Sequence, residues 1–360
     1  MQKKGRIMMK RILKIAGITL FIILLPIASL LVFLTVTEYR PGNKEAADTK
    51  IHMENALAAG QSVRILSWNT GYAGLDARAD FFMDGGTMVN PENQETVEQN
   101  LSAISGFLKQ GGYDICFLQE VDRNSSRTGG KDELSFYGGQ TGLGYSYAAN
   151  YRCRFVPYPL PPIGKIDSGI ATMSNLKMAK KPERISLPCP FSWPVRLANL
   201  KRCLLTTRYP IEGTDKELVA VNLHLEAYDD GEGKKAQTDA LMNLLQEEYK
   251  KGNYVIAGGD FNQTFPGSLE VFPIKNPELW TPGIVNEDIL PEGWHLAYDT
   301  ASPSCRLLNQ PYNPKSADTQ YYVIDGFIVS PNIKPDIVKT IDLGFSSSDH
   351  NPVELQITLE

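Results

Sequence analysis

Residues 254–262 read YVIAGGDFN and are the stretch that decides the fold. An apolar, β-prone run is followed by two glycines, which let the backbone turn tightly. Beyond the turn, the spacing of Asp260 and Asn262 places a carboxylate and an amide on one side of the chain. No G-x-G-x-x-G pattern opens a helix here, so a dinucleotide site is not predicted. The stretch predicts a buried strand whose end carries polar chemistry.

Three polar clusters upstream also follow apolar runs. Asn69 lies in SWNT after VRIL, and Glu120 lies in QEVD after DICFL. In NLHL, strand alternation places Asn222 and His224 on one face. Each signal is weak alone, because asparagine is common in turns and an acidic loop residue is usually solvated. A carboxylate at the mouth of a buried strand is, however, the kind of ligand that Mg²⁺ prefers.

Two further clusters lie downstream. In IDG, Asp325 interrupts an apolar run with one carboxylate, and in SDHNP, Asp349 stands beside His350 before the last apolar run. A carboxylate near an imidazole can hold it protonated, which suits contact with a phosphate. The other two histidines, His52 and His295, lie in polar or Trp- and Pro-containing surroundings and are expected to be ordinary exposed residues.

Taken in order, the clusters WN, QE, NLHL, GGDFN, ID and SDHNPV resemble the endonuclease/exonuclease/phosphatase superfamily, which includes deoxyribonuclease I, abasic-site endonucleases, inositol polyphosphate phosphatases and neutral sphingomyelinases. The resemblance spans Val63 to Leu359. It implies an α/β fold, a four-layer α/β/β/α sandwich like that of deoxyribonuclease I, with the site at one end between the sheets. It also implies a metal-dependent phosphoesterase.

The resemblance implies a metal-binding role for three residues. Glu120 is expected to bind the catalytic Mg²⁺, with Mn²⁺ as the alternative ion. Asn69 and Asp349 are expected to complete the metal shell directly or through water. Oxygen ligands of this kind suit a hard divalent cation.

The catalytic residues implied by the resemblance come from the remaining clusters. Asp260 is expected to orient or deprotonate the attacking water, and Asn262 to hold the phosphate. His350 and His224 are expected to donate to phosphoryl oxygens, with Asp325 fixing His350. A cation and fixed donors would stabilise the negative charge that develops during in-line attack.

Short β-rich runs alternate with longer helical patterns over residues 62–360, which predicts one α/β domain. Helices are predicted over Glu92 to Lys109 and Lys234 to Lys250, and a Pro- and aromatic-rich loop over Tyr151 to Gly164. Strands are predicted over Val63 to Trp68, Asp114 to Leu118, Gly169 to Ser174, Cys203 to Arg208, Leu218 to Leu225, Tyr254 to Ala257, Tyr321 to Val329 and Val353 to Thr358.

Residues Ile15 to Thr37 carry no charge and, at about 1.5 Å per helical residue, are long enough to cross a hydrocarbon core of about 30 Å. Pro26 is compatible with a membrane helix. Clustered cations remain on the cytoplasmic side. Those before the apolar run are Lys3, Lys4, Arg6, Lys10, Arg11 and Lys14.

We therefore expect a single-pass protein of a bacterial-type cell membrane. The expected parts are a cytoplasmic segment at 1–14, a transmembrane helix at 15–37, a stalk at 38–61 and an extracytoplasmic catalytic domain at 62–360. A cleaved signal peptide is the alternative, although its apolar core usually has only about 7 to 15 residues.

The charge balance bears on the substrate. The chain has 36 Lys and Arg against 41 Asp and Glu, and setting aside the N-terminal cations makes the remainder more acidic still. Tight binding to nucleic acid normally uses clustered cations, so a nucleic-acid partner is allowed but not favoured. The leading prediction is a monomeric phosphodiesterase or phosphatase for a lipid head group or a small phosphate ester.

Two other functional classes stay open. A surface nuclease would use the same catalytic set beside a basic groove. A non-catalytic binding module on the same fold would have lost Glu120, Asp260 or His350, and none of these is missing. The five cysteines contain no C-x-x-C pair, which argues against structural zinc, and their odd number leaves at least one thiol unpaired.

Overall fold

Two β-sheets pack face to face and form the centre of the structure. The computed structural model describes residues 2–51, 55–229 and 231–359. The eight-stranded sheet has the order β1 (Lys44–Ala46), β8 (Glu183–Ser186), β9 (Cys203–Glu212), β10 (Glu217–His224), β11 (Tyr254–Asp260), β17 (Asp325–Val329) and β14 (His295–Ala297), with β3 (Leu57–Ala58) also on β9. The seven-stranded sheet has the order β18 (Ile333–Thr340), β19 (Val353–Leu359), β4 (Ser62–Asn69), β5 (Ile115–Asp122), β7 (Gly164–Ser174), β6 (Gly144–Val156) and β2 (Asp48–Lys50).

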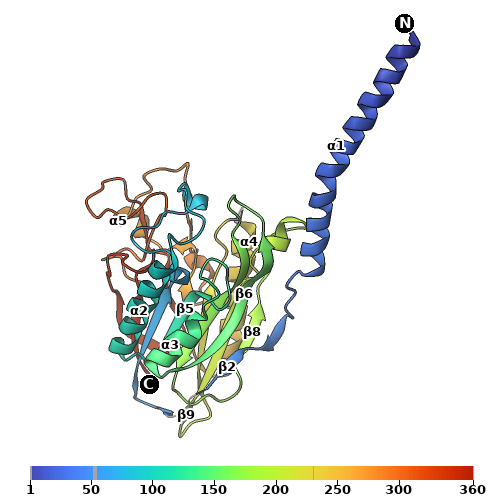
Figure 1. Ribbon diagram of the computed structural model, residues 1–360. Coiled ribbons are helices and arrows are strands. Elements are labelled where there is room, and N and C mark those ends of the chain that lie inside the picture. Colours follow the sequence, from blue (N-terminus) through green and yellow to red (C-terminus); the bar gives the residue numbers. More distant parts are fainter. Residues whose placement is uncertain (1, 52–54, 230, 360) are drawn as a thin grey trace.

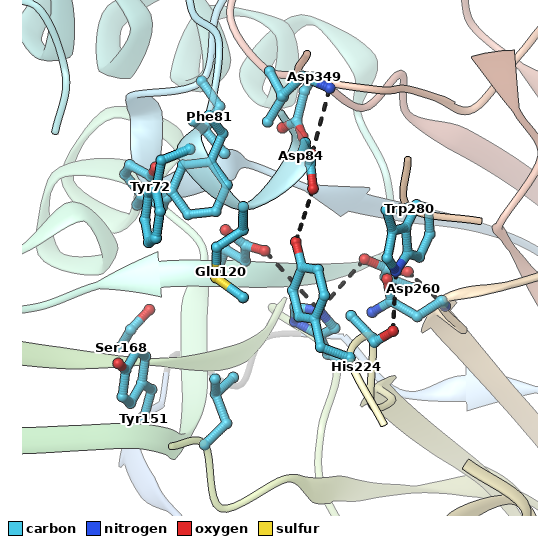
Figure 2. Close-up of a pocket in the computed structure, with 18 of the residues that line it drawn as sticks. Tyr72, Phe81, Asp84, Glu120, Tyr151, Ser168, His224, Asp260, Trp280 and Asp349 are labelled. Carbon is cyan, nitrogen blue, oxygen red and sulfur yellow. Dashed lines mark hydrogen bonds and ion pairs between the residues drawn. The ribbon is translucent and has the colours of Figure 1, made fainter. Parts of the chain in front are cut away.

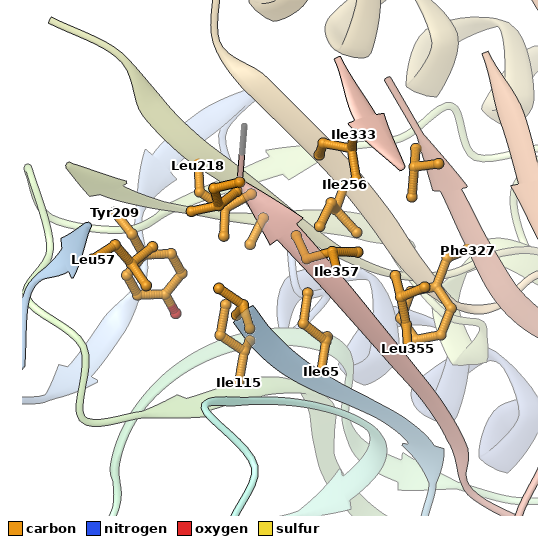
Figure 3. Packing of buried hydrophobic residues seen from close by; sticks show 14 of the residues in the cluster. Leu57, Ile65, Ile115, Tyr209, Leu218, Ile256, Phe327, Ile333, Leu355 and Ile357 are labelled. Atoms are coloured by element: carbon orange, nitrogen blue, oxygen red, sulfur yellow. The ribbon is translucent and has the colours of Figure 1, made fainter. Parts of the chain in front are cut away.

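The core between the sheets is apolar. Ile65 and Ile115 point from one sheet, and Leu218 and Ile256 from the other, into a single cluster of fully buried side chains (Figure 3). Burial of this kind is the main favourable contribution to folding. It explains why these strands read as almost continuous apolar runs in the sequence.

Helices cover the outer faces of the two sheets (Figure 1). Helices α2 (Gln94–Gly111) and α3 (Glu133–Thr141) pack on the seven-stranded sheet, and α4 (Glu232–Lys250) packs on the eight-stranded sheet. In α2 the side chain of Asn93 accepts from the Thr96 amide, and Gly112 ends the helix in a left-handed conformation. The predicted four-layer α/β/β/α sandwich is confirmed.

Shorter elements lie in the connections. They are the helix α5 (Ser268–Val271), the 3₁₀ turns η1 (Gly71–Ala73), η2 (Phe82–Asp84), η3 (Val195–Ala198) and η4 (Glu287–Ile289), and the strand pairs β12 (Gln263–Thr264) with β13 (Gly283–Ile284) and β15 (Cys305–Arg306) with β16 (Tyr321–Tyr322). All five cysteines are free thiols, and of these Cys189 is exposed.

The register of the strands collects the polar clusters at one end of the sandwich. Strands β4 and β5 run parallel, with Asn69 opposite Gln119, and β10 and β11 run parallel, with His224 opposite Asp260. Asp325 begins the antiparallel strand β17 opposite Asp260. Carboxyl ends of parallel strands meet at one edge of a sheet, so the sequence order of the clusters becomes a spatial group.

Several predicted boundaries need correction. The predicted loop from Tyr151 to Gly164 is wrong at its start, because β6 continues to Val156 and pairs with β7. The predicted strand from Tyr321 to Val329 is two strands, β16 and β17, which belong to different sheets. Strand β18 was not predicted, since the proline in IKPDIVKT is unfavourable within a strand.

The predicted stalk at 38–61 is also corrected. Its short strands pair with strands of the sandwich: β1 with β8, β2 with β6 and β3 with β9. This segment therefore adds strands to both sheets and belongs to the domain. Short edge strands of polar composition carry no periodic signal, and for that reason the sequence resembled a linker.

Helix α1 (Gln2–Val36) projects away from the sandwich (Figure 1). It includes the basic segment as well as the predicted span. Among the described residues, one helix is long and apolar enough to cross a membrane. It is this helix, over Gly5–Val36. The helix is therefore compatible with membrane anchoring, and the orientation across the membrane remains a prediction.

Gly259 is required where β11 passes β10. Its φ is +151°, and a Cβ atom there would collide with the carbonyl oxygen of Leu223. We expect Gly259→Ala to lower the free energy of unfolding by about 1 to 3 kcal/mol, as other overpacked sites do. The measurement is thermal and denaturant unfolding of the full chain in detergent micelles.

A matched control is available in α3. Gly139→Ala introduces a Cβ that meets nothing within 4 Å, and alanine in a helix is expected to be neutral or to stabilise by up to about 1 kcal/mol. Equal unfolding midpoints for the two variants would contradict the predicted close approach of β10 and β11.

Candidate active site

The predicted polar residues converge in a cavity of about 580 Å³ at the end of the sandwich. Figure 2 shows Glu120, His224, Asp260 and Asp349 facing this cavity from strands of both sheets and from the segment before β19. Asn262 and His350 line it as well. The structure therefore brings together clusters that lie far apart in the sequence.

Asn69 connects the two sheets at the floor of the cavity. Its Nδ2 donates to Oε1 of Glu120 at 3.2 Å and to Oδ2 of Asp260 at 3.0 Å. Its Oδ1 accepts from the Gly71 amide at 3.0 Å. In this orientation Asn69 positions two carboxylates through Nδ2, and Oδ1, which accepts from Gly71, keeps a second lone pair. Its role in the metal shell, directly or through water, stays a prediction.

Glu120 is directed into the cavity by an unusual backbone. Its φ is +54°, a left-handed value that non-glycine residues seldom adopt. The register between β5 and β7 shifts between Leu118 and Val121, at the same place. Strained backbone of this kind is found most often at functional sites. The bulge turns the Glu120 carboxylate away from the core, and 28% of the side chain remains exposed.

His350 forms a close pair with Asp325. Nδ1 of His350 lies 2.8 Å from Oδ2 of Asp325, and Ser304 Oγ donates to the same oxygen at 2.8 Å. Burial alone would lower the pKa of His350, but the carboxylate of Asp325, supported by Cys305 and Asp349, outweighs it and raises the pKa well above its usual value. His350 is therefore the protonated imidazole of the site. Its Nε2 lies 3.8 Å from Oδ2 of Asp260.

His224 is in the opposite state. Burial, with smaller contributions from Arg202 and His350, lowers its pKa well below the usual value, so the ring is neutral. Its Nε2 lies 3.4 Å from Oδ2 of Asp260 and 4.0 Å from Oε1 of Glu120. Because both neighbours are acceptors, we assign the ring proton to Nε2. Nδ1 has no hydrogen-bond partner among the residues that the structure describes.

Asp260 lies between the two histidines. Its Oδ1 accepts from the Asn262 amide at 2.8 Å. Burial raises its pKa to about 6, although the charge of His350 acts in the opposite direction. A carboxylate with this pKa is ionised at neutral pH and is a stronger base than an exposed aspartate. Asn262 has φ +50° and donates from Nδ2 to the Leu225 carbonyl, which fixes the turn.

The carboxylates of the site suit a hard divalent cation. Asp349 is buried, and burial together with the charge of Glu120 raises its pKa to about 7. Within the described ranges, no Lys or Arg forms an ion pair with Glu120, Asp260, Asp325 or Asp349. Apart from His350, which lies beside Asp260, Asp325 and Asp349, these carboxylates have no cationic partner there, and oxygen ligands of this kind are what Mg²⁺ or Mn²⁺ binds. Glu120 and Asp349, which line the same cavity, are the residues that would hold the ion.

Sequence reasoning missed other polar residues of the cavity wall. Asp84 is buried, its pKa is raised to about 6 by burial, and it accepts from the Tyr228 hydroxyl at 3.0 Å. The guanidinium of Arg127 lies 3.4 Å from the ring centre of Tyr72. No sequence pattern marked these residues. Of the other histidines, His295 is exposed, as expected, and His52 lies outside the described residues.

Comparisons with known proteins agree with this fold. A sequence model described as Endonuclease/Exonuclease/phosphatase family matches residues 66–350. The solved endonuclease/exonuclease/phosphatase from Beutenbergia cavernae DSM 12333 aligns with a TM-score of 0.59 and 16% identity, over 83% of this chain and 72% of that one. A search of curated proteins finds no match.

Two further solved structures are similar. An endonuclease/exonuclease/phosphatase family protein from Leptotrichia buccalis C-1013-b has a TM-score of 0.53 and 18% identity, covering 83% of this chain and 99% of that one. TDP2 from D. rerio, complexed with a single-strand DNA product, has a TM-score of 0.50 and 14% identity, covering 83% and 99%. At these identities the likeness concerns the fold.

The charge state of His350 can be tested directly. Asp325→Asn removes the charge that holds the imidazole protonated, so the pKa of His350 is expected to fall towards or below its usual value. Because a raised histidine pKa stabilises the fold below about pH 6.5 and this stabilisation fades as pH rises through the folded-state value, the variant loses stability mainly at low pH. Histidine-selective ¹⁵N NMR titration measures the pKa.

Asp336→Asn is the control for this experiment. Asp336 lies on β18 and accepts from the Thr358 hydroxyl on the surface. The substitution Asp336→Asn should leave the pKa of His350 unchanged. An Asp325→Asn protein whose His350 titrates as in the parent would show that Asp325 does not set its charge.

Cation binding is expected to stabilise the fold. Mg²⁺ or Mn²⁺ at about 100 times its dissociation constant should add about 2.7 kcal/mol to the free energy of unfolding. The gain should be larger above about pH 7 than below it, because protons compete for Asp349. Unfolding midpoints with the ion and with EDTA measure it. Glu120→Gln should abolish this gain in the free energy of unfolding. The control, Glu292→Gln at an exposed residue, should keep it. Equal gains in the two variants would exclude Glu120 as a ligand.

Proposed function

Because the chain belongs to the endonuclease/exonuclease/phosphatase family, we propose that it hydrolyses a phosphate ester at the site around Asp260, with Mg²⁺ or Mn²⁺. Enzymes of this family are hydrolases that depend on divalent metals and cleave phosphate esters. The observation that carries the proposal is the position of two imidazoles beside one carboxylate oxygen: Nε2 of His224 lies 3.4 Å and Nε2 of His350 lies 3.8 Å from Oδ2 of Asp260.

Asp260 is the base in this proposal. Its Oδ2 is held by Asn69 and lies within 4 Å of both imidazoles, so it faces the space in which a water molecule and a phosphate would meet. An ionised carboxylate with a pKa of about 6 can orient the water and accept its proton at neutral pH. As the water oxygen bonds to phosphorus, the bond from phosphorus to the ester oxygen breaks, and the leaving oxygen departs as the alcohol with a proton from solvent. A positioned base contributes roughly 10²- to 10⁴-fold to the rate.

The histidines are the donors. Protonated His350, held by Asp325 through Nδ1, presents its Nε2 proton to a phosphoryl oxygen, and neutral His224 presents its own Nε2 proton beside it. Both rings are buried and their donors are already oriented, so little reorganisation is needed as negative charge develops. The cation, when bound, supplies charge neutralisation at the same oxygens.

The proposed location is the outer face of a cell membrane. Support comes from α1, whose apolar part follows six basic residues, since clustered cations remain in the cytoplasm. The helix leaves the sandwich without a long free linker, because the strands of residues 44–58 return at once to the sheets. The hydrolase would therefore act close to the membrane surface.

A nuclease is the second candidate, because D. rerio TDP2 of similar fold was solved with a single-strand DNA product. The charged residues that line the cavity give the nuclease hypothesis little support. The described lining contains arginines but no lysine, and Arg127 is paired with Asp122 while Arg202 lies 3.5 Å from Glu226. Arg306 donates to backbone carbonyls. Of the three arginines in this described lining, two lie beside a carboxylate, whereas clustered free cations contribute most of the affinity for nucleic acid.

The full chain in detergent or nanodiscs, assayed with Mg²⁺ and with EDTA, tests the proposal. Substrates are bis-p-nitrophenyl phosphate, sphingomyelin, phosphatidylinositol, plasmid DNA and RNA. Asp260→Asn and His350→Ala should each lower the metal-dependent rate by roughly 10²- to 10⁴-fold. His295→Ala, at an exposed histidine, should leave it unchanged. Full activity in correctly folded Asp260→Asn would contradict the mechanism.

A further inference from the structure

Exposed apolar side chains gather on two segments of the domain beside α1. The loop between β6 and β7 exposes 70% of Tyr158 and 87% of Leu160, and the segment leading into η3 exposes 50% of Trp193 and 55% of Val195. We refer to these four residues as the apolar rim. Adjacent exposed apolar residues of this size mark a surface that is covered by something else.

The apolar rim is attached to the end of helix α1. Leu34, buried, packs with Val156 of β6 and Leu197 of η3. Trp193 Nε1 donates to the Thr35 hydroxyl at 3.1 Å. Glu38, which follows the helix, lies 3.1 Å from Arg196 and 3.4 Å from Lys201. The last turn of the helix is therefore fixed to Trp193, to η3 and to the end of β6, from which the loop with Tyr158 and Leu160 continues.

The helix fixes the depth of the apolar rim. A span needs about 20 residues to cross a hydrocarbon core of about 30 Å. Counted from Ile15, the first residue after the last cation, this length ends close to Leu34. The turn that packs on the domain is therefore the turn that leaves the hydrocarbon. Trp193, whose indole donates to Thr35, would then lie in the interfacial layer, where tryptophan is enriched.

One member of the apolar rim, Tyr158, also lines the catalytic cavity. It does so together with Val156, Pro157, Ile163 and Leu200. The lining contains four further apolar residues, Leu75, Phe81, Phe82 and Met83. The rings of Phe82 and Tyr158 contact each other edge to face, with centroids 6.0 Å apart.

The polar groups of the site line the same cavity as these apolar residues. Figure 2 shows Tyr72 and Phe81 around this cavity together with Glu120, His224 and Asp260. Figure 1 shows α1 projecting past the same end of the sandwich that carries α5. Apolar side chains, among them Tyr158 of the apolar rim, thus share one cavity with the carboxylates.

We propose that the apolar rim lies in the outer head-group layer of the membrane spanned by α1, and that the ester cleaved is the head-group phosphate of a lipid in that membrane. The lipid phosphate would reach Asp260 and His350 while its acyl chains remain against Phe82, Tyr158 and the membrane. This inference rests on the proposed function. It accounts for two observations that hydrolysis of a water-soluble ester leaves unexplained, the exposed Leu160 and the apolar side chains that line the cavity.

The position of the apolar rim can be measured independently of activity. Four native cysteines are buried and Cys189 is exposed, so a Cys189→Ser background carrying Leu160→Cys can be labelled selectively with a nitrobenzoxadiazole probe. The full chain is placed in phosphatidylcholine nanodiscs with and without head-group spin-labelled lipid. We expect strong quenching at position 160.

Ile337→Cys provides the matched control. Ile337 is 48% exposed on the edge strand β18, away from the apolar rim. A probe there should be quenched little. Equal quenching at positions 160 and 337 would overturn the membrane seating.

The substrate is tested with Leu160→Glu, since Leu160 does not line the cavity. Sphingomyelin or phosphatidylinositol in vesicles is compared with soluble bis-p-nitrophenyl phosphate. We expect Leu160→Glu to lower the rate of lipid hydrolysis about tenfold or more, because the free energy gained by burying the leucine side chain in the interface is lost. The rate on the soluble ester should change by less than about twofold, as for other surface substitutions. Ile337→Glu should change neither rate.

Each other result overturns a defined part of the inference. A loss of both rates, or of neither, in Leu160→Glu would overturn the role of the apolar rim in lipid access. Cleavage of plasmid DNA but of no lipid by the parent protein would identify a nuclease instead. Failure of the parent on every ester, including the soluble one, would refute the proposed function and with it the lipid substrate, whereas quenching at position 160 would still support the seating of the rim.

Discussion

The amide of Asn222 is the contact on which the site depends, because it joins the two sheets directly beneath the cavity. Its Nδ2 donates to the carbonyls of Leu118, at 3.2 Å, and Ala171, at 2.7 Å, and its Oδ1 accepts from Gln119 Nε2 at 2.8 Å. Glu120 follows Gln119, and His224 lies two residues beyond Asn222. One buried amide therefore sets the distance between a carboxylate of one sheet and an imidazole of the other. Loss of either partner would leave buried polar groups unsatisfied.

The site concentrates charge and backbone strain that the rest of the fold must offset. The left-handed backbones of Glu120 and Asn262 each cost about 1 to 3 kcal/mol. Buried carboxylates raise the cost further, and the protonated His350 compensates for part of it. The apolar core between the sheets supplies the compensating stability. The two imidazoles differ because Asp325 bonds to His350, while Nδ1 of His224 has no partner in the described structure.

The sequence predicted most reliably those parts whose signal is local. GGDFN and IDG mark strand ends because glycines and single carboxylates interrupt apolar runs, and the register then brings Asp260 opposite Asp325. The short strands β1 and β2, of sequence KEA and DTK, carry no apolar periodicity and were read as a stalk. Asp84 and its partner Tyr228 escaped notice because their contact joins residues distant in the chain. Apolar cavity linings built from loops are likewise invisible to periodicity.

The rigid junction between α1 and the domain has a kinetic consequence. With Leu34 buried and Glu38 bound to Arg196 and Lys201, the mouth of the cavity is held at a constant height and tilt. With the seating in the membrane that we propose, such a domain cannot swing out to sample the bulk solution and would act in cis on its own bilayer. Encounters would then be collisions in two dimensions, and turnover should follow the mole fraction of substrate in the leaflet rather than its total amount in the suspension. Dilution with inert lipid would slow the protein, and dilution with buffer would not.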